Sequence, residues 1–224
     1  MLETPILYAI QTFVSFCITY NSGVESERGR STRQRIIEQT ARLCRERPGA
    51  DLSVAEIAAA AGVFPNQVTY YFGAKDSLLV RAAFLGLLHD AGRLERLGLA
   101  ATDAAAFRAG IARAVLALPA LPAVARALAA GIARPELAPV IDKHLGLLFR
   151  QSERYLRRLT RERGWALDRP AAVEARTFWC TALGAVLLSR AGASGSRADL
   201  DLAGTLSIRD AAGTTRHDEH LPYP

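Results

Sequence analysis

The segment spanning residues 53–71 constrains the fold most, because it encodes two short helices joined by a tight turn. Ser53 and Glu56 have the spacing of a capping box, in which the hydroxyl and the carboxylate each bind a backbone N–H at a helix start. Gly62 ends this helix, since glycine enters the left-handed conformation at little cost. Pro65 suits the first turn of the next helix. The pattern predicts a helix-turn-helix, whose second helix enters the major groove of DNA.

The side chains along these helices fit such a unit. Ala58 and Ala61 are small enough to let the two helices cross closely, and Val63 and Val68 are apolar plugs between them. Three outward residues of the second helix carry groups that can read bases: Asn66, Gln67 and Thr69. Amide side chains pair with adenine, and a threonine methyl group can contact the methyl group of thymine.

Groups that bind phosphate flank this second helix. Tyr70 and Tyr71 can reach the DNA backbone, and Lys75 begins the next helix, whose free N–H groups also attract anions. Upstream, the stretch 28–47 holds seven arginines against two glutamates, a surplus of five within a net charge of +6 for the whole chain. Arginines near its start are expected to contact DNA in the minor groove or at phosphates, although a solvated helix face is the alternative. These are Arg28, Arg30 and Arg33.

The rest of the chain also has the apolar spacing of helices, three or four residues apart. Breaks at Pro or Gly divide it, and no stretch of five or more residues alternates apolar with polar, so the predicted fold class is all-α. The predicted helices are 32–47, 53–61, 65–71, 75–97, 102–118, 121–133, 137–163 and 170–191. Residues 192–224 are rich in Gly, Ser, Asp and Thr and are interpreted as a tail, with a short strand at 205–208 as one possibility.

Composition excludes several classes of protein. With 50% hydrophobic and 22% charged residues among 224, the chain is not intrinsically disordered. No apolar run reaches the roughly 18 residues of a membrane-spanning helix, so no membrane partner is expected. The three cysteines are far apart, which favours a reducing cytoplasm over a disulfide framework. His217 and His220 flank two carboxylates but lie in the tail without a scaffold, so neither a metal site nor a cofactor is expected.

The helix-turn-helix region resembles the DNA-binding domain of the TetR/AcrR family of one-component regulators. The resemblance covers residues 32–79 and rests on the motifs Ala61-Gly62-Val63, Tyr71-Phe72-Gly73-Ala74-Lys75 and Leu78-Leu79, which fall in register. It implies a homodimer, a divergent helical ligand-binding domain, and repression of transcription that a small molecule releases. Two positions depart from the family pattern: Phe64 stands where Ser or Thr is usual, and Thr69 where Tyr is frequent. A side-chain cap is therefore expected to be missing before the second helix.

This reading divides the chain into four parts. They are an extra N-terminal segment and flexible arm (1–31), a DNA-binding domain (32–79), a ligand-binding and dimerisation domain (80–191) and the tail (192–224). Residues 1–24 are apolar and unlike the rest, and either a translation start at Val24 or a genuine additional segment explains them equally well. The DNA-binding residues implied are Arg33, Ser53, Pro65, Asn66, Gln67, Thr69, Tyr70, Tyr71 and Lys75.

Two features of the second domain bear on its function. Aromatic and aliphatic side chains predict an apolar effector cavity, with plain core as the alternative for each residue: Phe107, Leu116, Phe149, Phe178 and Trp179. An apolar seam predicts that helices 137–163 and 170–191 pair across a homodimer as a four-helix bundle, with an intramolecular core as the alternative. The seam comprises Ile141, Leu145, Leu148, Ser152, Leu156 and Leu159, beside Val173, Ala182, Gly184 and Val186.

The function expected is that of a ligand-responsive transcription regulator, acting as a homodimer on double-stranded DNA in the cytoplasm. The alternative is an all-helical enzyme or interaction bundle without sequence-specific DNA binding. Neither a G-x-S-x-G elbow nor a phosphate-cradling glycine loop is present in the sequence, and its His and Cys residues form no nucleophile pair, so catalysis is not expected.

Overall fold

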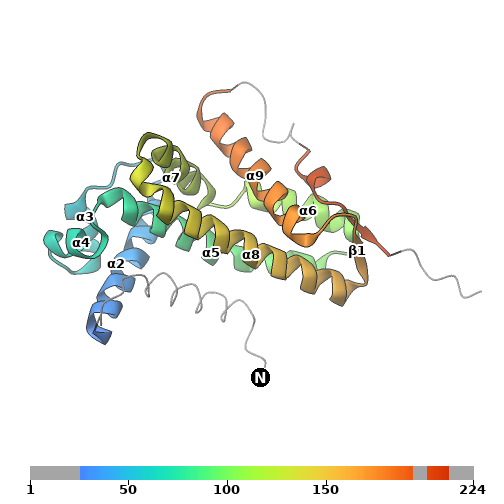
Figure 1. Cartoon of the computed structure of the whole chain (residues 1–224), viewed down its shortest axis with the longest axis horizontal. Coiled ribbons are helices and arrows are strands. Elements are labelled where there is room, and N and C mark those ends of the chain that lie inside the picture. Colours follow the sequence, from blue (N-terminus) through green and yellow to red (C-terminus); the bar gives the residue numbers. More distant parts are fainter. Residues whose placement is uncertain (1–25, 194–200, 212–224) are drawn as a thin grey trace, which may run out of the picture.

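The computed structural model describes residues 26–193 and 201–211 as an elongated helical molecule (Figure 1). The elements in chain order are α2 (Glu27–Glu46), α3 (Val54–Ala61), α4 (Pro65–Phe72), α5 (Lys75–Ala100), α6 (Ala104–Leu116), α7 (Leu121–Ala133), η1 (Pro135–Leu137), α8 (Ala138–Arg163), β1 (Trp165–Leu167), α9 (Ala171–Arg190), η3 (Ala203–Thr205) and β2 (Ile208–Asp210). The all-α prediction is confirmed, with one small two-stranded ribbon added to it.

Helices α2, α3 and α4 form one end of the molecule and share a core with the start of α5 (Figure 1). The apolar residues spaced along α2 face inward, and Ile36 is fully buried. Ile57 of α3, Val68 of α4 and Leu78 of α5 meet it in the same core, each 1% exposed or less. This packing leaves the opposite face of α4 in solvent.

The predicted capping box of α3 is confirmed. Ser53 Oγ accepts the Glu56 N–H at 3.1 Å, and the Glu56 carboxylate accepts the Ser53 N–H at 2.8 Å. At the other end Gly62 has φ of 61°, the left-handed conformation that ends the helix. Capping of this kind is worth about 1 kcal/mol and determines where the turn to α4 begins.

The flexible arm predicted for residues 1–31 is wrong in the part that the structure describes. Helix α2 begins at Glu27, five residues before the predicted start, and Ser26 caps it by accepting the Gly29 N–H at 3.2 Å. The Thr32 hydroxyl, expected at the helix start, instead donates to the Arg28 carbonyl one turn earlier. The remainder of this segment, residues 1–25, lies outside the described residues.

Helix α5 connects the two halves of the molecule. It starts beside α4 and runs into the second domain, where α6, α7 and α8 pack against it (Figure 1). Helices α8 and α9 form the other long pair of this domain. The position of one half relative to the other therefore depends on contacts along α5.

The apolar seam of α8 faces this domain's own core, which corrects its interpretation as a dimer surface. Leu148, Leu156 and Leu159 are 5%, 4% and 1% exposed, and Val186 of α9 is fully buried. They pack against other helices of the same chain. The periodicity was the same for either arrangement, and only the position of the neighbouring helices decides between them. Val173 is the exception, at 45% exposed.

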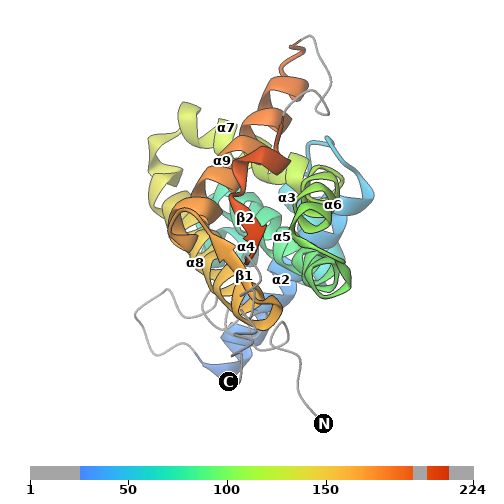
Figure 2. The ribbon, with the colours of Figure 1, turned by 90° about the vertical axis from the view of Figure 1, so that its right-hand side faces the viewer.

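The tail predicted from residue 192 is wrong for its described part, residues 201–211. Residues 208–210 pair antiparallel with 165–167, and Figure 2 views the molecule from the end that carries this ribbon, opposite α3 and α4. Leu202, Leu206 and Ile208 are at most 2% exposed, so this segment belongs to the core. The strand lies a few residues later than the predicted 205–208 because the 3-10 turn η3 occupies the earlier positions.

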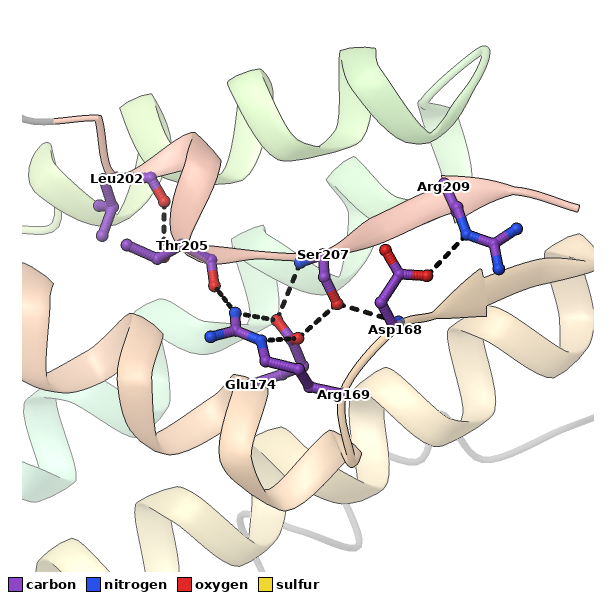
Figure 3. A network of polar contacts seen from close by, with 7 residues as sticks. All are labelled: Asp168, Arg169, Glu174, Leu202, Thr205, Ser207 and Arg209. Atoms are coloured by element: carbon purple, nitrogen blue, oxygen red, sulfur yellow. Dashed lines mark hydrogen bonds and ion pairs between the residues drawn. The ribbon is translucent and has the colours of Figure 1, made fainter.

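An ion pair with a buried carboxylate links this segment to α9 (Figure 3). The carboxylate of Glu174 is inaccessible to solvent and accepts two hydrogen bonds from Arg169, at 2.8 and 3.2 Å. It also accepts the backbone N–H of Ser207 at 3.0 Å and its hydroxyl at 2.5 Å. Arg169 donates in addition to the Thr205 carbonyl. All oxygen atoms of the buried carboxylate thus have partners, as a buried charge requires.

Helix α9 is long and apolar enough to cross a membrane, by length and composition alone. Half of its most apolar window is buried inside the fold. The buried side is covered by α6, α7 and α8. Its apolar composition is thus accounted for by packing within the chain.

Candidate nucleic-acid interface

Helix α4 presents a polar face to solvent at one end of the molecule. Asn66, Thr69 and Tyr70 are exposed, and Tyr70 reaches 81%, whereas Val68 and Phe72 are buried. The predicted reading residues Asn66 and Thr69 therefore share the open face with Tyr70. A helix exposed in this way can enter the major groove of a duplex without rearranging the core.

Gln67 is half-buried and has a local role that the sequence analysis missed. Its side-chain Oε1 accepts the backbone N–H of Phe64 at 3.0 Å. The Phe64 side chain makes no cap, as predicted, so Gln67 supplies only the second half of a capping box, the half that accepts the N–H of the N-cap residue. Its position three residues after the N-cap was the available signal. Its carbonyl oxygen is engaged in this arrangement.

Lys75 is the first residue of α5 and lies beside α4. Its amine forms an ion pair with the carboxylate of Asp51 at 2.7 Å. The N-cap residue Ala74 supplies no side-chain hydrogen bond, so the first turn of α5 keeps N–H groups available to an anion. A lysine beside uncapped N–H groups at a helix start is a combination that can bind an anion.

Arg33 is 6% exposed, which corrects its expected role as a direct phosphate contact. Its guanidinium donates to the Tyr71 carbonyl at 3.3 Å and lies 5.9 Å from the centre of the Tyr71 ring. Tyr71 is half-buried, and the ring of Tyr70 meets it edge-on at 5.1 Å. Arg33 therefore supports the C-terminal end of α4 from behind.

Ser53 is exposed, but its hydroxyl is engaged in the capping box. It donates to the Glu56 carboxylate at 2.7 Å, and the Ser53 backbone N–H donates to the same group. These bonds, with a further one from Arg47, lower the pKa of Glu56 to about 2. The main role of Ser53 is thus to cap and orient the start of α3. Pro65, also among the predicted contacts, is exposed at the start of α4.

The exposed arginines of α2 add positive charge near this end of the molecule. Arg28, Arg30 and Arg35 are exposed, and Arg42 is paired at 3.7 Å with Glu46 in solvent. Arg28 and Arg30 lie in the first turn of α2 instead of in an unstructured arm. They are accessible to a phosphate, unlike Arg33.

The predicted effector residues do not lie in one aromatic group. Phe107 is 1% exposed and lies 5.6 Å from the Trp165 ring and 6.4 Å from the Tyr155 ring. Among the described ring contacts, none joins Phe107 to the α9 pair Phe178 and Trp179.

The other predicted effector residues lie along α6, α8 and α9. Trp179 donates from Nε1 to Ser152 Oγ at 2.7 Å, and Phe178 is buried beside it. Phe149 carries the Arg176 guanidinium over its ring at 5.2 Å. Leu116 is half-buried against the core. These positions fit core packing as well as the wall of a ligand site.

The described residues hold no group of three side chains suited to binding a metal ion. His217 and His220 lie outside the described residues.

The fold and the exposed helix define a helix-turn-helix protein with a helical second domain. The sequence matches the family described as bacterial regulatory proteins, tetR family, over residues 36–82, and the family described as bacterial transcriptional repressor C-terminal over residues 104–207. The second match includes residues 201–207 and ends one residue before β2 begins. No curated protein matches the sequence.

Solved structures share the architecture. A protein from Rhodococcus sp. RHA1, assigned as a transcriptional regulator, is 28% identical with a TM-score of 0.62, covering 77% of this chain and 92% of that one. Reduced NemR of E. coli is 15% identical with a TM-score of 0.53, covering 78% and 95%. The fatty acid degradation regulator FadR of Bacillus halodurans is 18% identical with a TM-score of 0.52, covering 83% and 97%.

The protein is therefore a transcription regulator that binds DNA through its helix-turn-helix. More particularly, the chain belongs to the TetR family.

Proposed function

We propose that this regulator is a repressor, which binds a palindromic operator as a homodimer and leaves it when a small apolar molecule binds the helical domain. The observation that carries the proposal is the exposed polar face of α4 beside Lys75, on a helix that continues into the second domain. As a DNA-binding regulator it would act in the cytoplasm, and family membership favours regulation over catalysis. Residues 32–79 would bind DNA, with α2 extending this domain to residue 27, and residues 80–191 would bind the effector and the partner subunit.

Two kinds of DNA contact are assigned within the site. Asn66, Gln67 and Thr69 would read base edges, because they lie toward the start and middle of α4. Tyr70 and Lys75 would bind backbone phosphates.

Three residues of the predicted set act differently in this assignment. Tyr71 would contact the backbone only with its exposed part, since Arg33 lies against its ring. Arg33 and Ser53 would position α4 and α3 and not bind DNA themselves.

Helix α7 offers a route from effector to operator, because both of its ends are joined to α5. The Asp90 carboxylate accepts the Ala120 N–H at 3.1 Å, just before α7 starts. Arg134, at the other end of α7, pairs with Asp76, the neighbour of Lys75. A displacement of α7 by an effector would move α5 and, with it, the phosphate-binding lysine.

The partner subunit would contact the exposed face of α9. Val173 and Leu188 are 45% and 57% exposed, and Cys180 between them is exposed as well. Thr177 and Gly184 complete a row at helical spacing and are partly exposed. A two-fold axis would place this face against its own copy, so that the half-sites of the operator would be related by a dyad.

The test is a gel-shift titration of the full chain against the DNA flanking its own gene, with a scrambled duplex as control. Saturable binding of the flanking DNA with a preference of at least about a thousandfold over the scrambled duplex is expected of a specific regulator. Equal affinity for both duplexes would contradict the proposal. A repressor further requires that transcription from the bound promoter falls when the protein is added.

A further inference from the structure

An exposed phenyl ring stands at the leading end of the reading helix. Phe64 is the residue before α4, and 76% of it is accessible to solvent. Pro65, the first residue of α4, is exposed beside it. Large apolar side chains are mostly buried in folded proteins, and this one is exposed at the surface where the helix would meet DNA.

The backbone around Phe64 has few donors to offer a phosphate. Pro65 has no N–H, the Phe64 N–H is bound by the Gln67 side chain at 3.0 Å, and the Gln67 N–H is bound by the Phe64 carbonyl at 3.0 Å. The start of α5 differs, since Lys75 lies there and no side chain caps the helix. The start of α4 would therefore present the apolar ring of Phe64 to the DNA, whereas the start of α5 would present the charged amine of Lys75.

We propose that Phe64 determines base specificity by packing its ring against the C5-methyl group of a thymine in each half-site. This inference rests on the proposed function, because it needs α4 in the major groove. The thymine methyl is the one apolar group on the base edges of that groove, and phenylalanine is among the side chains that contact it. Phe64 adjoins Asn66 and Gln67 at the same end of α4, so its thymine lies next to the bases those amides read.

Tyr70 is the other strongly exposed aromatic residue of the region and serves as a contrast. It is 81% exposed but lies near the opposite end of α4, and its hydroxyl can bind a phosphate. A ring without a polar group, at the leading end, has only apolar groups of the DNA to contact. The two exposed rings thus have different partners.

The experiment is a double-mutant cycle, in which the methyl group is removed from the DNA and the ring from the protein, each alone and both together. The operator is first selected from a random duplex pool by the wild-type protein. Each thymine is then replaced in turn by deoxyuridine, which lacks only the methyl group, and affinities are measured for wild type and Phe64→Ala. One thymine per half-site should lose about fourfold in affinity for wild type, the value expected for one buried methyl group.

In Phe64→Ala, the same deoxyuridine replacement should have no effect, while other positions behave as in wild type. Thr69→Ala also removes a methyl group from the exposed face of α4 and is the matched control: it should retain the loss at the Phe64 thymine and change the response only at the base that Thr69 itself reads. Thermal melting shows that both variants fold, which the exposure of both side chains favours.

Four outcomes would overturn the inference. Phe64→Ala could keep full sensitivity to every deoxyuridine, or it could weaken operator and scrambled duplexes equally, which would indicate a backbone contact. If the wild-type protein selects no sequence from the pool, the proposed function itself fails, and the role of Phe64 fails with it. If the wild-type protein selects an operator but no deoxyuridine replacement lowers its affinity, the inference about Phe64 fails while the proposed function stands.

Discussion

The amine of Lys75 lies 2.7 Å from the carboxylate of Asp51, which joins the first residue of α5 to the loop before α3. The Asp51 side chain is 90% exposed and the Lys75 side chain 29%. Exposed ion pairs of this kind contribute about 0–1 kcal/mol, because water screens them. A phosphate can therefore replace Asp51 as the partner of Lys75, and in the proposed complex Asp51 would compete with DNA for the lysine.

Replacing Lys75 by Ala should weaken binding to all duplexes about equally and reduce the dependence of log K on log salt by about one unit. Asp51→Asn should do the opposite, raising affinity for cognate and scrambled duplexes alike, because it removes a negative charge and frees the lysine. Fluorescence anisotropy at several salt concentrations measures both effects. A change in base preference for Lys75→Ala would contradict its assignment to the backbone.

Gln67→Ala should cost about 1–3 kcal/mol on the operator and relax the choice of base at one position per half-site. Because Gln67 also caps α4, the thermal stability of the Gln67→Ala protein should fall as well. Gln67→Glu separates the two roles, since its carboxylate can still accept the Phe64 N–H but cannot donate to a base. We expect this variant to melt like wild type and to lose discrimination at the same base pair, and normal discrimination would remove Gln67 from the reading set.

Leu188→Glu should convert the dimer to monomers without unfolding the chain, because the side chain is 57% exposed in the single subunit. Leu148→Ala is the counterpart on α8. That side chain is 5% exposed within the core, so its loss should lower the free energy of unfolding by about 2–5 kcal/mol. Sedimentation velocity and denaturant titration of both variants test this. An unchanged dimer for Leu188→Glu would place the contact elsewhere.

Glu174→Ala should lower the free energy of unfolding by about 1–3 kcal/mol, because it leaves the part-buried Ser207 N–H without its acceptor and removes the carboxylate partner of Arg169, which keeps contact with water. The ion pair of Asp168 with Arg209, at 2.7 Å and 56% exposed on each side, provides the control on the same ribbon. Asp168→Asn should change stability by less than about 1 kcal/mol. Urea titration measures the free energy of unfolding of both variants. If both lose the same amount, burial of the Glu174 carboxylate does not explain its contribution to stability.

Stability should fall in acid because of His144, which is 1% exposed beside the ring of Phe84. Burial lowers the pKa of His144 to about 4 from an ordinary 6.5, although its Nδ1–H donates to the Val140 carbonyl. Between pH 6.5 and 4, His144 binds a proton in the unfolded chain but stays neutral in the folded chain. The free energy of unfolding should drop by about 3 kcal/mol across this window and be constant with respect to His144 below it.

His144→Gln cannot titrate, so it should lack this part of the pH dependence. Urea titrations of both proteins at pH 7, 5.5 and 4 give the difference between them. Parallel curves would show that other groups cause the acid sensitivity.

Much of the helix-turn-helix was predictable because its signals act within a few residues. The Ser53–Glu56 capping box and the left-handed Gly62 are where the spacing placed them. The partner of Gln67 was within reach of the same rule, since Phe64 lies three residues before it. The burial of Arg33 was not, because it depends on Tyr71 of a different helix coming to lie against it.

The helices, the ends of α3 at Ser53 and Gly62, and the exposed face of α4 follow from the sequence, because capping and apolar periodicity depend on neighbours along the chain. Which neighbour each apolar face covers depends on how the helices pack in three dimensions. An apolar row on α8 can cover a partner or its own core with the same spacing, and the position of α9 makes it core. The ribbon of residues 165–167 with 208–210 and the Glu174 network depend likewise on segments far apart in sequence, which no local pattern brings together.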